Sequence, residues 1–343
     1  MAEQVAMEQA QVQGEDEMVV DDFQEIEALA ELGVSAADVK KAKEGGFYTI
    51  QSLIMNPRKQ RLHAVKGLSE AKADKMVEAA KKLTTAGSWI SGAEAMQKRA
   101  REIVKVTTGA AALDTLLGGG METKAITELY GEYRTGKTQL CHTLCVAVQL
   151  PITQGGGAGK AAYVDTEGTF RPERIRAIAA RFNLDPDAVL DNIVVGRAHT
   201  VDGQMELLQA VGAKMVEEPY KLLIVDSIMA LFRTDFTGRG ELAERQQKLG
   251  QMMALLKKIS EEFNVAVVVT NQVMSDPGGG MTFVADPKKP VGGHVMAHAS
   301  TQRLYLRKGK GEQRVAKVVD SPCLAEGEAS FALSDDGVVE YKE

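Results

Sequence analysis

One eight-residue stretch of the sequence combines glycines, a lysine and a threonine in the order that binds nucleotide phosphates. It matches the pattern G-x-x-x-x-G-K-[ST] at Gly131, Glu132, Tyr133, Arg134, Thr135, Gly136, Lys137 and Thr138. Glycines let such a loop curl so that its backbone N–H groups and the N-terminus of the next helix surround phosphate oxygens. The Lys137 ammonium is then expected to contact the β- and γ-phosphates, and the Thr138 hydroxyl to bind Mg²⁺. The stretch therefore predicts a site for ATP with Mg²⁺.

Three further polar residues follow apolar runs that have the composition of buried strands. Asp226 ends one run and is placed to accept Mg²⁺, directly or through water. Glu167 follows a second run and is the candidate to orient or deprotonate the attacking water. Gln272 follows a third and is placed to contact a γ-phosphate. Each has a structural alternative, as a helix cap or a partner for backbone groups, but beside a phosphate loop the three together indicate triphosphate hydrolysis.

The elements that must position these residues alternate along the chain. From Thr108 onward, short β-branched runs alternate with helical stretches, which predicts an α/β core with a mostly parallel sheet and helices on both faces. Ligands of such sheets bind at the carboxyl ends of the strands, where the polar residues lie. A stripe with helical spacing is interpreted as core at Leu249, Met252, Met253, Leu256 and Ile259. The expected strands span residues 125–130, 161–165, 222–226 and 265–270, and a helix is expected at 139–150.

Two polar stretches, residues 233–240 and 273–293, carry the residue types that hold nucleic acid. The second is too rich in Gly and Pro to pack as an element and is expected to be a functional loop. Cations bind phosphates while apolar side chains wedge between bases or stack on them. The residues concerned are Arg233, Phe236, Arg239, Met274, Met281 and Phe283. Further positive charge is expected near one later strand pair, at Arg303, Arg307, Lys308, Lys310, Arg314 and Lys317.

The N-terminal quarter divides into an acidic tail and a basic helical domain. Residues 1–27 hold nine acids and no base, and removing them from the net charge of −6 leaves +3 for the remainder. We expect this tail to be a solvated, disordered end. Residues 28–84 are expected to form short helices, one of them at 70–83, with interspersed Lys and Arg. The turn around Lys66 and Gly67 resembles the hairpin of a helix-hairpin-helix, which binds a DNA phosphate, although an ordinary helix-helix turn has the same pattern.

Residues 85–108 are expected to form a linker between this domain and a core at residues 109–343. Small residues surround an apolar pair, Trp89 and Ile90, within it. The pair is suited to docking on a neighbouring molecule, but composition alone favours packing onto its own chain.

Composition bounds the class of protein. With 44% hydrophobic and 26% charged residues and no apolar run of membrane-spanning length, neither a wholly disordered nor a membrane-spanning chain is expected. Three cysteines, Cys141, Cys145 and Cys323, are too few for a disulfide framework and form no Cys-x-x-Cys zinc pattern. The N-terminus lacks the features of a signal or transit peptide, so we expect a protein that stays inside the cell.

Several motifs together resemble those of the eukaryotic RecA-family strand-exchange recombinases. They read GEYRTGKT at 131–138, DTEGTFRPER at 165–174, GRGELAERQ at 238–246, ADPKKP at 285–290 and AHAST at 297–301. The resemblance covers about residues 25–335 and implies a RecA-like P-loop ATPase core with a small all-α helix-hairpin-helix domain before it. It also implies a DNA-dependent ATPase of the nucleus that forms helical filaments, with rings as a further form, and exchanges single-stranded DNA with homologous duplex.

The resemblance also implies roles for individual residues. Arg233 and Arg239 would lie in a first DNA-binding loop and residues 273–291, with Val273, Met274 and Phe283, in a second. Residues 29–84 would guide duplex DNA.

Other implied roles concern ATP held between subunits and the contact that assembles them. Arg174 would stack on adenine. His298, and Asp320 to Pro322 of the next protomer, would couple or cap the nucleotide. Ile90 and Ala93 fall where the family has a Phe-x-x-Ala polymerisation anchor, with Ile replacing Phe.

Two subgroups and two rival functions stay open. SIMALF at 227–232 and MTF at 281–283 resemble the meiosis-specific recombinase, whereas RLYL at 303–306 and DSPCL at 320–324 resemble the general-repair type, and we favour the former. The rivals are a RecA-fold helicase or motor, and a non-catalytic mediator subunit that binds nucleotide only to assemble with a true recombinase. The expected partners are single- and double-stranded DNA, further copies of the chain and recombination mediator proteins, with no membrane.

Overall fold

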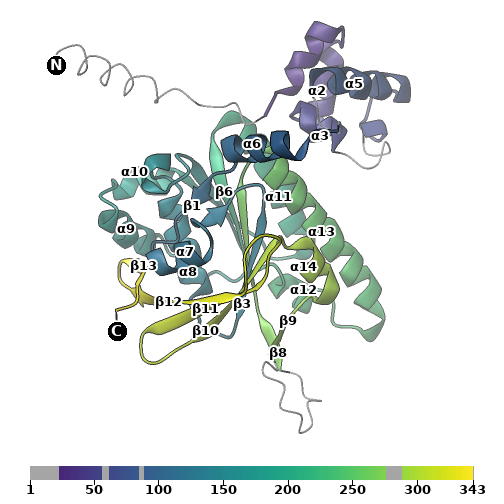
Figure 1. The fold of residues 1–343 in the computed structure, drawn as a ribbon. Coiled ribbons are helices and arrows are strands. Elements are labelled where there is room, and N and C mark those ends of the chain that lie inside the picture. Colours follow the sequence, from purple (N-terminus) through teal and green to yellow (C-terminus); the bar gives the residue numbers. More distant parts are fainter. Residues whose placement is uncertain (1–22, 56–61, 85–88, 276–287, 343) are drawn as a thin grey trace, which may run out of the picture.

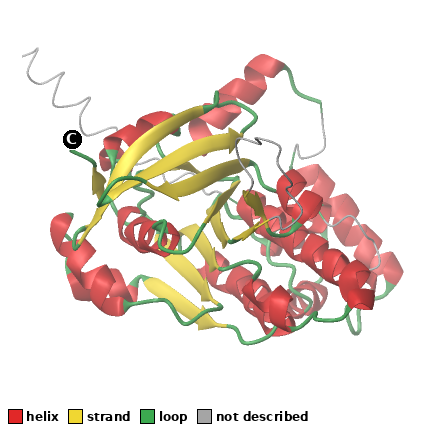
Figure 2. Ribbon diagram, turned by 90° about the horizontal axis from the view of Figure 1, so that it is seen from below, coloured by secondary structure: helices red, strands yellow, loops and turns green. Residues whose placement is uncertain are grey.

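The computed structural model describes residues 23–55, 62–84, 89–275 and 288–342. Its larger part is a sheet of nine strands with helices on both faces, and a small group of helices stands beside it (Figure 1, Figure 2). The strands are β1 (Lys105–Val106), β2 (Met121–Glu122), β3 (Ile126–Gly131), β4 (Lys160–Asp165), β5 (Ile193–Arg197), β6 (Tyr220–Asp226), β7 (Ala266–Asn271), β8 (Val273–Ser275), β9 (Lys288–Pro290), β10 (Gln302–Lys308), β11 (Gln313–Asp320), β12 (Gly327–Ser334) and β13 (Gly337–Glu340). The helices are η1 (Ile26–Leu32), α2 (Ala36–Glu44), α3 (Ile50–Ile54), α5 (Glu70–Leu83), α6 (Gly92–Glu102), α7 (Ala111–Leu116), α8 (Lys137–Ala147), η2 (Ile152–Gln154), α9 (Pro172–Arg181), α10 (Pro186–Asp191), α11 (Val201–Glu217), α12 (Ala230–Thr234), η3 (Arg239–Glu241), α13 (Leu242–Glu262) and α14 (Gly293–Ala299).

The large sheet has the order β13-β12-β11-β10-β3-β7-β6-β4-β5. The strands from β10 to β5 run parallel, and β11, β12 and β13 extend the sheet by antiparallel pairing. Side chains alternate between two cores: Leu222 and Ile224 of β6 pack on the side of α8 and α9, and Leu223 and Val225 on the side of α11 and α13. Because both faces are covered, the central strands are buried and mostly apolar, with Glu128 of β3 as a buried exception.

The expected α/β core is confirmed. The four strands expected from the sequence correspond to β3, β4, β6 and β7, and α8 takes the place of the helix expected at 139–150. The stripe interpreted as core lies on α13 and is fully buried. No helix in the described ranges combines the length and apolar content needed to cross a bilayer.

The helical N-terminal domain consists of η1, α2, α3 and α5 around its own core. The expected disordered tail of residues 1–27 is wrong at its end, since residues 23–27 are part of the fold. Ile26 is fully buried, and the Phe23 ring lies edge-on to Phe263 of the larger part at 5.4 Å. The acids Glu25 and Glu27 alternate with these apolar residues and are exposed, so counting charge concealed the apolar spacing.

A buried hydrogen bond joins this domain to the larger part. Thr49, the N-cap of α3, donates its hydroxyl to the Glu262 carboxylate at 2.6 Å, and both side chains are buried. Lys258 lies over the Phe47 ring at 5.5 Å and 3.8 Å from Glu262. Burial raises the pKa of Glu262 above its ordinary value of 4.5, against the opposing effects of Lys258 and Thr49.

The expected linker is more structured than its composition indicated. Ser91 caps α6 in a reciprocal pair of hydrogen bonds with Glu94, and β1 pairs with β2, so the core begins before residue 109. Packing of Trp89 and Ile90 onto their own chain is not observed, because Trp89 is fully exposed and Ile90 half-exposed. α6 itself buries none of its residues.

The two stretches expected to hold DNA also contain regular structure. α12 ends at Thr234 and η3 begins at Arg239, so the first loop is short. The flanks of the second stretch pair as the antiparallel strands β8 and β9, which project below the sheet in Figure 1. Met281 and Phe283 lie outside the described residues.

Candidate nucleotide site

The phosphate loop connects β3 to α8 at the carboxyl edge of the sheet. Gly136 at the N-cap of α8 has a φ of 101°, a backbone conformation that favours glycine. Lys137 turns back over the loop, where its Nζ donates to the carbonyls of Gly131 at 2.9 Å and Glu132 at 2.8 Å. The ammonium and the first amides of α8 thus face the same space, as a phosphate site requires.

Asp226, at the tip of β6, collects hydroxyl groups from three other strands and helices. Its carboxylate accepts from Thr138 at 2.8 Å and from Tyr163 at 2.7 Å, and also from Thr270 and Thr169. The side chain is almost fully buried. A buried carboxylate next to a threonine hydroxyl supplies the hard oxygen donors that Mg²⁺ prefers, so the residues present fit this ion.

Burial also sets the electrostatics around Lys137. It lowers the pKa of Lys137, while the carboxylates of Asp226 and Glu167 oppose the change. An anion placed beside the ammonium would favour its charged form. The environment is therefore suited to a phosphate ligand.

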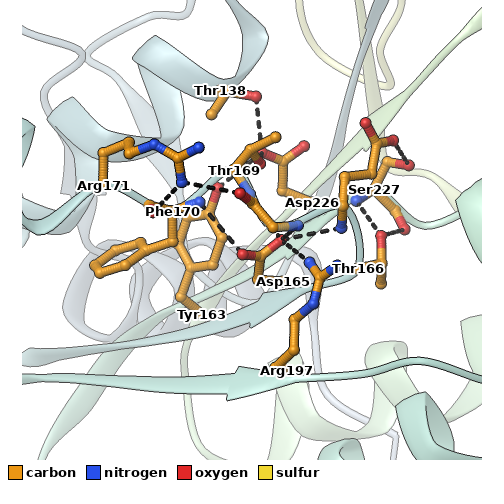
Figure 3. A network of polar contacts seen from close by, with 12 residues as sticks. Thr138, Tyr163, Asp165, Thr166, Thr169, Phe170, Arg171, Arg197, Asp226 and Ser227 are labelled. Atoms are coloured by element: carbon orange, nitrogen blue, oxygen red, sulfur yellow. Dashed lines mark hydrogen bonds and ion pairs between the residues drawn. The ribbon is translucent and has the colours of Figure 1, made fainter.

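A second carboxylate organises the loop that carries Glu167 (Figure 3). Asp165, at the end of β4, accepts backbone N–H bonds from Glu167 at 3.0 Å, Gly168 at 2.7 Å and Thr169 at 3.2 Å on one oxygen, and from Phe170 at 3.3 Å on the other. Arg197 of β5 donates to the first oxygen at 2.8 Å. Five donors therefore fix the turn between β4 and α9.

Glu167 itself lies among three polar side chains. Its Oε1 accepts from the Ser227 hydroxyl at 2.8 Å and from the Gln272 amide at 3.2 Å. The amide oxygen of Gln272 accepts in turn from Arg233 at 2.5 Å. Glu167, Gln272 and the expected DNA residue Arg233 are thus in one connected group.

These residues line a single open cleft with a volume of about 1010 Å³, which is adequate for a nucleoside triphosphate. Its lining includes the whole phosphate loop, Glu167, Asp226, Gln272, Val273 and Arg314. Arg314, expected from the sequence to add positive charge near a strand pair, donates its Nε–H to the carbonyl of Arg134 in the phosphate loop at 3.2 Å. The pairing register of β11 places it there, which the sequence does not reveal.

Arg174 lies next to the cleft on α9. Its guanidinium donates to Gln139 at 3.1 Å and to the backbone carbonyls of Ser334 and Asp335. Gln139 lines the cleft, so Arg174 is one hydrogen bond away from the cleft lining. On the same helix, the backbone N–H of Arg171 donates to His142 Nε2 at 3.2 Å, and burial lowers the pKa of His142 to about 4, which keeps this nitrogen an acceptor.

Other residues expected at the nucleotide do not line the cleft of a single chain. His298 lies exposed on α14, its ring stacked on His294 at 5.9 Å, and Asp320 and Pro322 are exposed at and beyond the end of β11. All three were expected to act across a subunit boundary.

The residues expected to bind DNA occupy separate places. Met274 is exposed on β8, and Arg233 is exposed on α12. Lys66 is exposed and Gly67 has a φ of 81° in the turn before α5. Ala93 is exposed near the start of α6. The expected basic strand pair is partly neutralised, because the partly buried Arg303 pairs with the buried Glu128 at 2.6 Å and Arg307 pairs with Glu328 at 2.7 Å.

Sequence reasoning missed several residues that hold the site together. Two of them donate to Asp226: Tyr163 from β4 and Thr270 from β7. Ser227, directly after β6, donates to Glu167, and Arg197 of β5 donates to Asp165. The sequence did not indicate Tyr163 because it lies within an apolar run. Burial, together with Asp226, raises the pKa of Tyr163 well above the ordinary value of 10.0, so the side chain remains a hydroxyl donor.

Comparison with known proteins identifies relatives over nearly the whole chain. The Rad51 family model matches residues 98–341. A meiotic recombination protein DMC1 homolog of Lilium longiflorum is 59% identical over 323 residues, covering 94% of this chain and 91% of the relative. The Arabidopsis thaliana DMC1 homolog is 57% identical over 100% and 98% of the two chains, and the Homo sapiens DMC1/LIM15 homolog is 56% identical over 99% of both.

Proposed function

The chain belongs to the Rad51 family, and from this premise we propose that it is an ATP-dependent DNA strand-exchange recombinase. It assembles as a helical filament on single-stranded DNA and pairs that strand with a homologous duplex. The names of its relatives support a place in meiotic recombination. We further propose a role in double-strand break repair, the nucleus as its location and recombination mediator proteins as partners.

The observation that carries the proposal is the meeting of four strand ends at one cleft. The phosphate loop follows β3, Glu167 follows β4, Asp226 ends β6 and Gln272 follows β7. Each of the four residue types has a distinct task in triphosphate hydrolysis. If these residues only capped helices or bonded backbone groups, there would be no reason for all four to line the same cleft.

We assign the chemistry as follows. Lys137 and the amides of the phosphate loop hold the β- and γ-phosphates, while Thr138 and Asp226 hold Mg²⁺, which neutralises phosphate charge when bound. Glu167 orients the attacking water and takes its proton as the γ-phosphate is released from ADP. Asp165 and Arg197 fix the backbone of the loop that presents Glu167.

Gln272 is proposed to report the γ-phosphate to the DNA-binding segment. It lines the cleft and directly precedes β8, which enters the second expected DNA loop. Contact with the γ-phosphate would order that loop against DNA, and hydrolysis would release it. ATP therefore acts as a switch for DNA affinity, with Arg233, Arg239, Val273, Met274 and Phe283 on the DNA side.

Assembly is proposed to complete the site. Arg174 stacks on adenine from one protomer, while His298 and Asp320 to Pro322 of its neighbour close over the nucleotide. The exposed linker supplies the contact that joins protomers, and because Trp89 is more exposed than Ile90, we include Trp89 in the anchor with Ile90 and Ala93. The turn at Lys66 and Gly67 guides duplex DNA.

Joint-molecule formation between a single strand and homologous duplex tests the proposal. The pure protein should form joint molecules only with ATP and homologous DNA, with Lys137→Ala as the inactive control. Unwinding of a forked duplex without homology would instead indicate a helicase or motor. Nucleotide binding without DNA-stimulated hydrolysis would indicate a mediator subunit.

A further inference from the structure

Two hydrogen bonds, through Gln272, link an exposed arginine to the proposed catalytic glutamate. Arg233 Nη1 donates to Gln272 Oε1 at 2.5 Å, and Gln272 Nε2 donates to Glu167 Oε1 at 3.2 Å. Ser227 donates to the same oxygen of Glu167 at 2.8 Å. Both polar atoms of the Gln272 amide are thus occupied within the protein, and one oxygen of Glu167 is engaged by two donors.

The fold explains why these residues meet. Ser227 and Arg233 follow the tip of β6, Arg233 lying on the short helix α12, and Gln272 follows the neighbouring strand β7. The side chain of Arg233 points out of the fold far enough to be exposed, whereas Gln272 is only partly exposed. A ligand from solvent therefore reaches the guanidinium before it reaches the amide.

The Arg233 contact is one that a phosphate can displace. Its acceptor in the protein is the neutral amide oxygen of Gln272. A guanidinium binds an anionic phosphate through hydrogen bonds that are often bidentate and that add the attraction between opposite charges, which the neutral amide oxygen of Gln272 does not supply. Once Arg233 turns to a phosphate, Gln272 loses the bond that orients its amide toward Glu167.

We propose that Arg233 is a positioning residue that keeps Gln272 on Glu167 until nucleic acid binds. A DNA phosphate takes the guanidinium, Gln272 becomes free to turn to the γ-phosphate, and the oxygen of Glu167 that Gln272 occupied becomes available to water. The contact is an inhibitory one in the DNA-free protein, and its release accounts for stimulation of hydrolysis by DNA. This inference rests on the proposed function and adds a regulatory step to the same site.

The test compares DNA-free and DNA-stimulated ATP hydrolysis in Arg233→Met, which keeps an unbranched side chain and removes the guanidinium with its charge and donors. We expect its DNA-free kcat to rise on the order of fivefold, with a correspondingly smaller stimulation by single-stranded DNA. Arg233→Lys, which retains the charge and a donating group but lacks the planar guanidinium, should lie between wild type and Arg233→Met. Arg176→Met is the matched control, because Arg176 is an exposed arginine of α9 paired with Asp187 of α10, and its replacement should leave both rates unchanged.

Other roles for Arg233 give different results. If it only binds DNA, the DNA-free kcat stays at the wild-type value and more DNA is needed for half-maximal stimulation. If Arg233 only supports the fold, the DNA-free and the DNA-stimulated rates of hydrolysis both fall, and so does the midpoint temperature of thermal unfolding. Either result overturns the inference.

A second variant tests whether Gln272 carries the effect. In the Gln272→Ala background, Arg233→Met should leave the DNA-free kcat unchanged, whereas the same rise in both backgrounds would contradict the relay. A wild-type protein whose hydrolysis does not respond to DNA would refute the proposed function itself. A responsive wild type with an unchanged Arg233→Met basal rate would refute only this inference.

Discussion

Asp165→Asn is the substitution whose effect can be worked out most fully from the structure. The carboxylate of Asp165 accepts four backbone N–H groups and one guanidinium, and only 6% of the side chain is exposed. Hydrogen bonds to a charged acceptor contribute about 1.5–3 kcal/mol each, against about 0.5–1.5 kcal/mol for neutral pairs. An asparagine retains one acceptor oxygen but turns an NH₂ group toward either Phe170 N–H or the other donors.

Because three of the four N–H groups share one oxygen, each contributes less than a full bond, and we expect a loss of free energy of unfolding of about 2–4 kcal/mol. Three N–H bonds would each lose part of their strength, the Phe170 N–H would lose its acceptor, and the Arg197 contact counts for little because its guanidinium is more than a third exposed. A looser turn also displaces Glu167, so we expect kcat for ATP hydrolysis to fall about tenfold to a hundredfold. KM for ATP should change less than about threefold, since the phosphate loop lies on other elements.

Urea unfolding followed by circular dichroism and steady-state phosphate release measure the two effects. Asp187→Asn is the matched control, because its pair with Arg176 is exposed on both sides and contributes below about 0.5 kcal/mol. A variant with wild-type kcat and wild-type stability would refute the view that Asp165 fixes the Glu167 loop. A variant with lower stability but unchanged kcat would show that the loop is fixed by other contacts.

Three further predictions follow from single contacts. Lys137→Ala should bind a fluorescent ATP analogue at least tenfold more weakly than wild type. Glu167→Gln should bind the analogue normally but hydrolyse ATP at least about a hundredfold more slowly. Hydrolysis by Glu167→Gln at the wild-type rate would show that Glu167 does not activate the water. Glu262→Gln keeps the acceptor for Thr49 but cannot ionise. Because the pKa of Glu262 is raised in the folded state, the stabilising contribution of its protonated form is complete below pH 4.5 and is lost as pH rises through the folded pKa. The variant should therefore gain stability relative to wild type with rising pH in denaturation measured across that range, and a constant difference in stability would contradict this. Trp89→Ala should shift the assembled protein toward monomers in sedimentation velocity, with association about thirtyfold weaker per contact. Ile90→Ala should have a smaller effect. A larger loss of association in Ile90→Ala than in Trp89→Ala would assign the anchor to Ile90.

The fold and the centre of the site could be predicted because their signals are local. The phosphate loop is contiguous, and Asp226 directly follows a run of apolar residues, so neither needs knowledge of the tertiary structure. The alternation of strands and helices was sufficient to predict the mostly parallel core. These are the features for which neighbours along the chain decide the structure.

The remaining features depend on which strands become neighbours in the sheet. Ser227 meets Glu167 because β6 pairs with β4, and Arg314 enters the cleft because of the register between β10 and β11. The acids around Ile26 concealed a helix, and the exposed pair at Trp89 and Ile90 could not be distinguished from a packed one by composition. The roles that need a second protomer, such as that of His298, stay predictions.

Single-stranded DNA affinity in different nucleotide states tests the central claim most directly. Fluorescence anisotropy of a labelled oligonucleotide, measured at fixed salt with Mg²⁺ and either ATP or ADP, gives the two dissociation constants. We predict at least tenfold tighter binding with ATP, because the γ-phosphate engages Gln272 at the start of β8. The same affinity with ATP and ADP would contradict a nucleotide switch at this cleft.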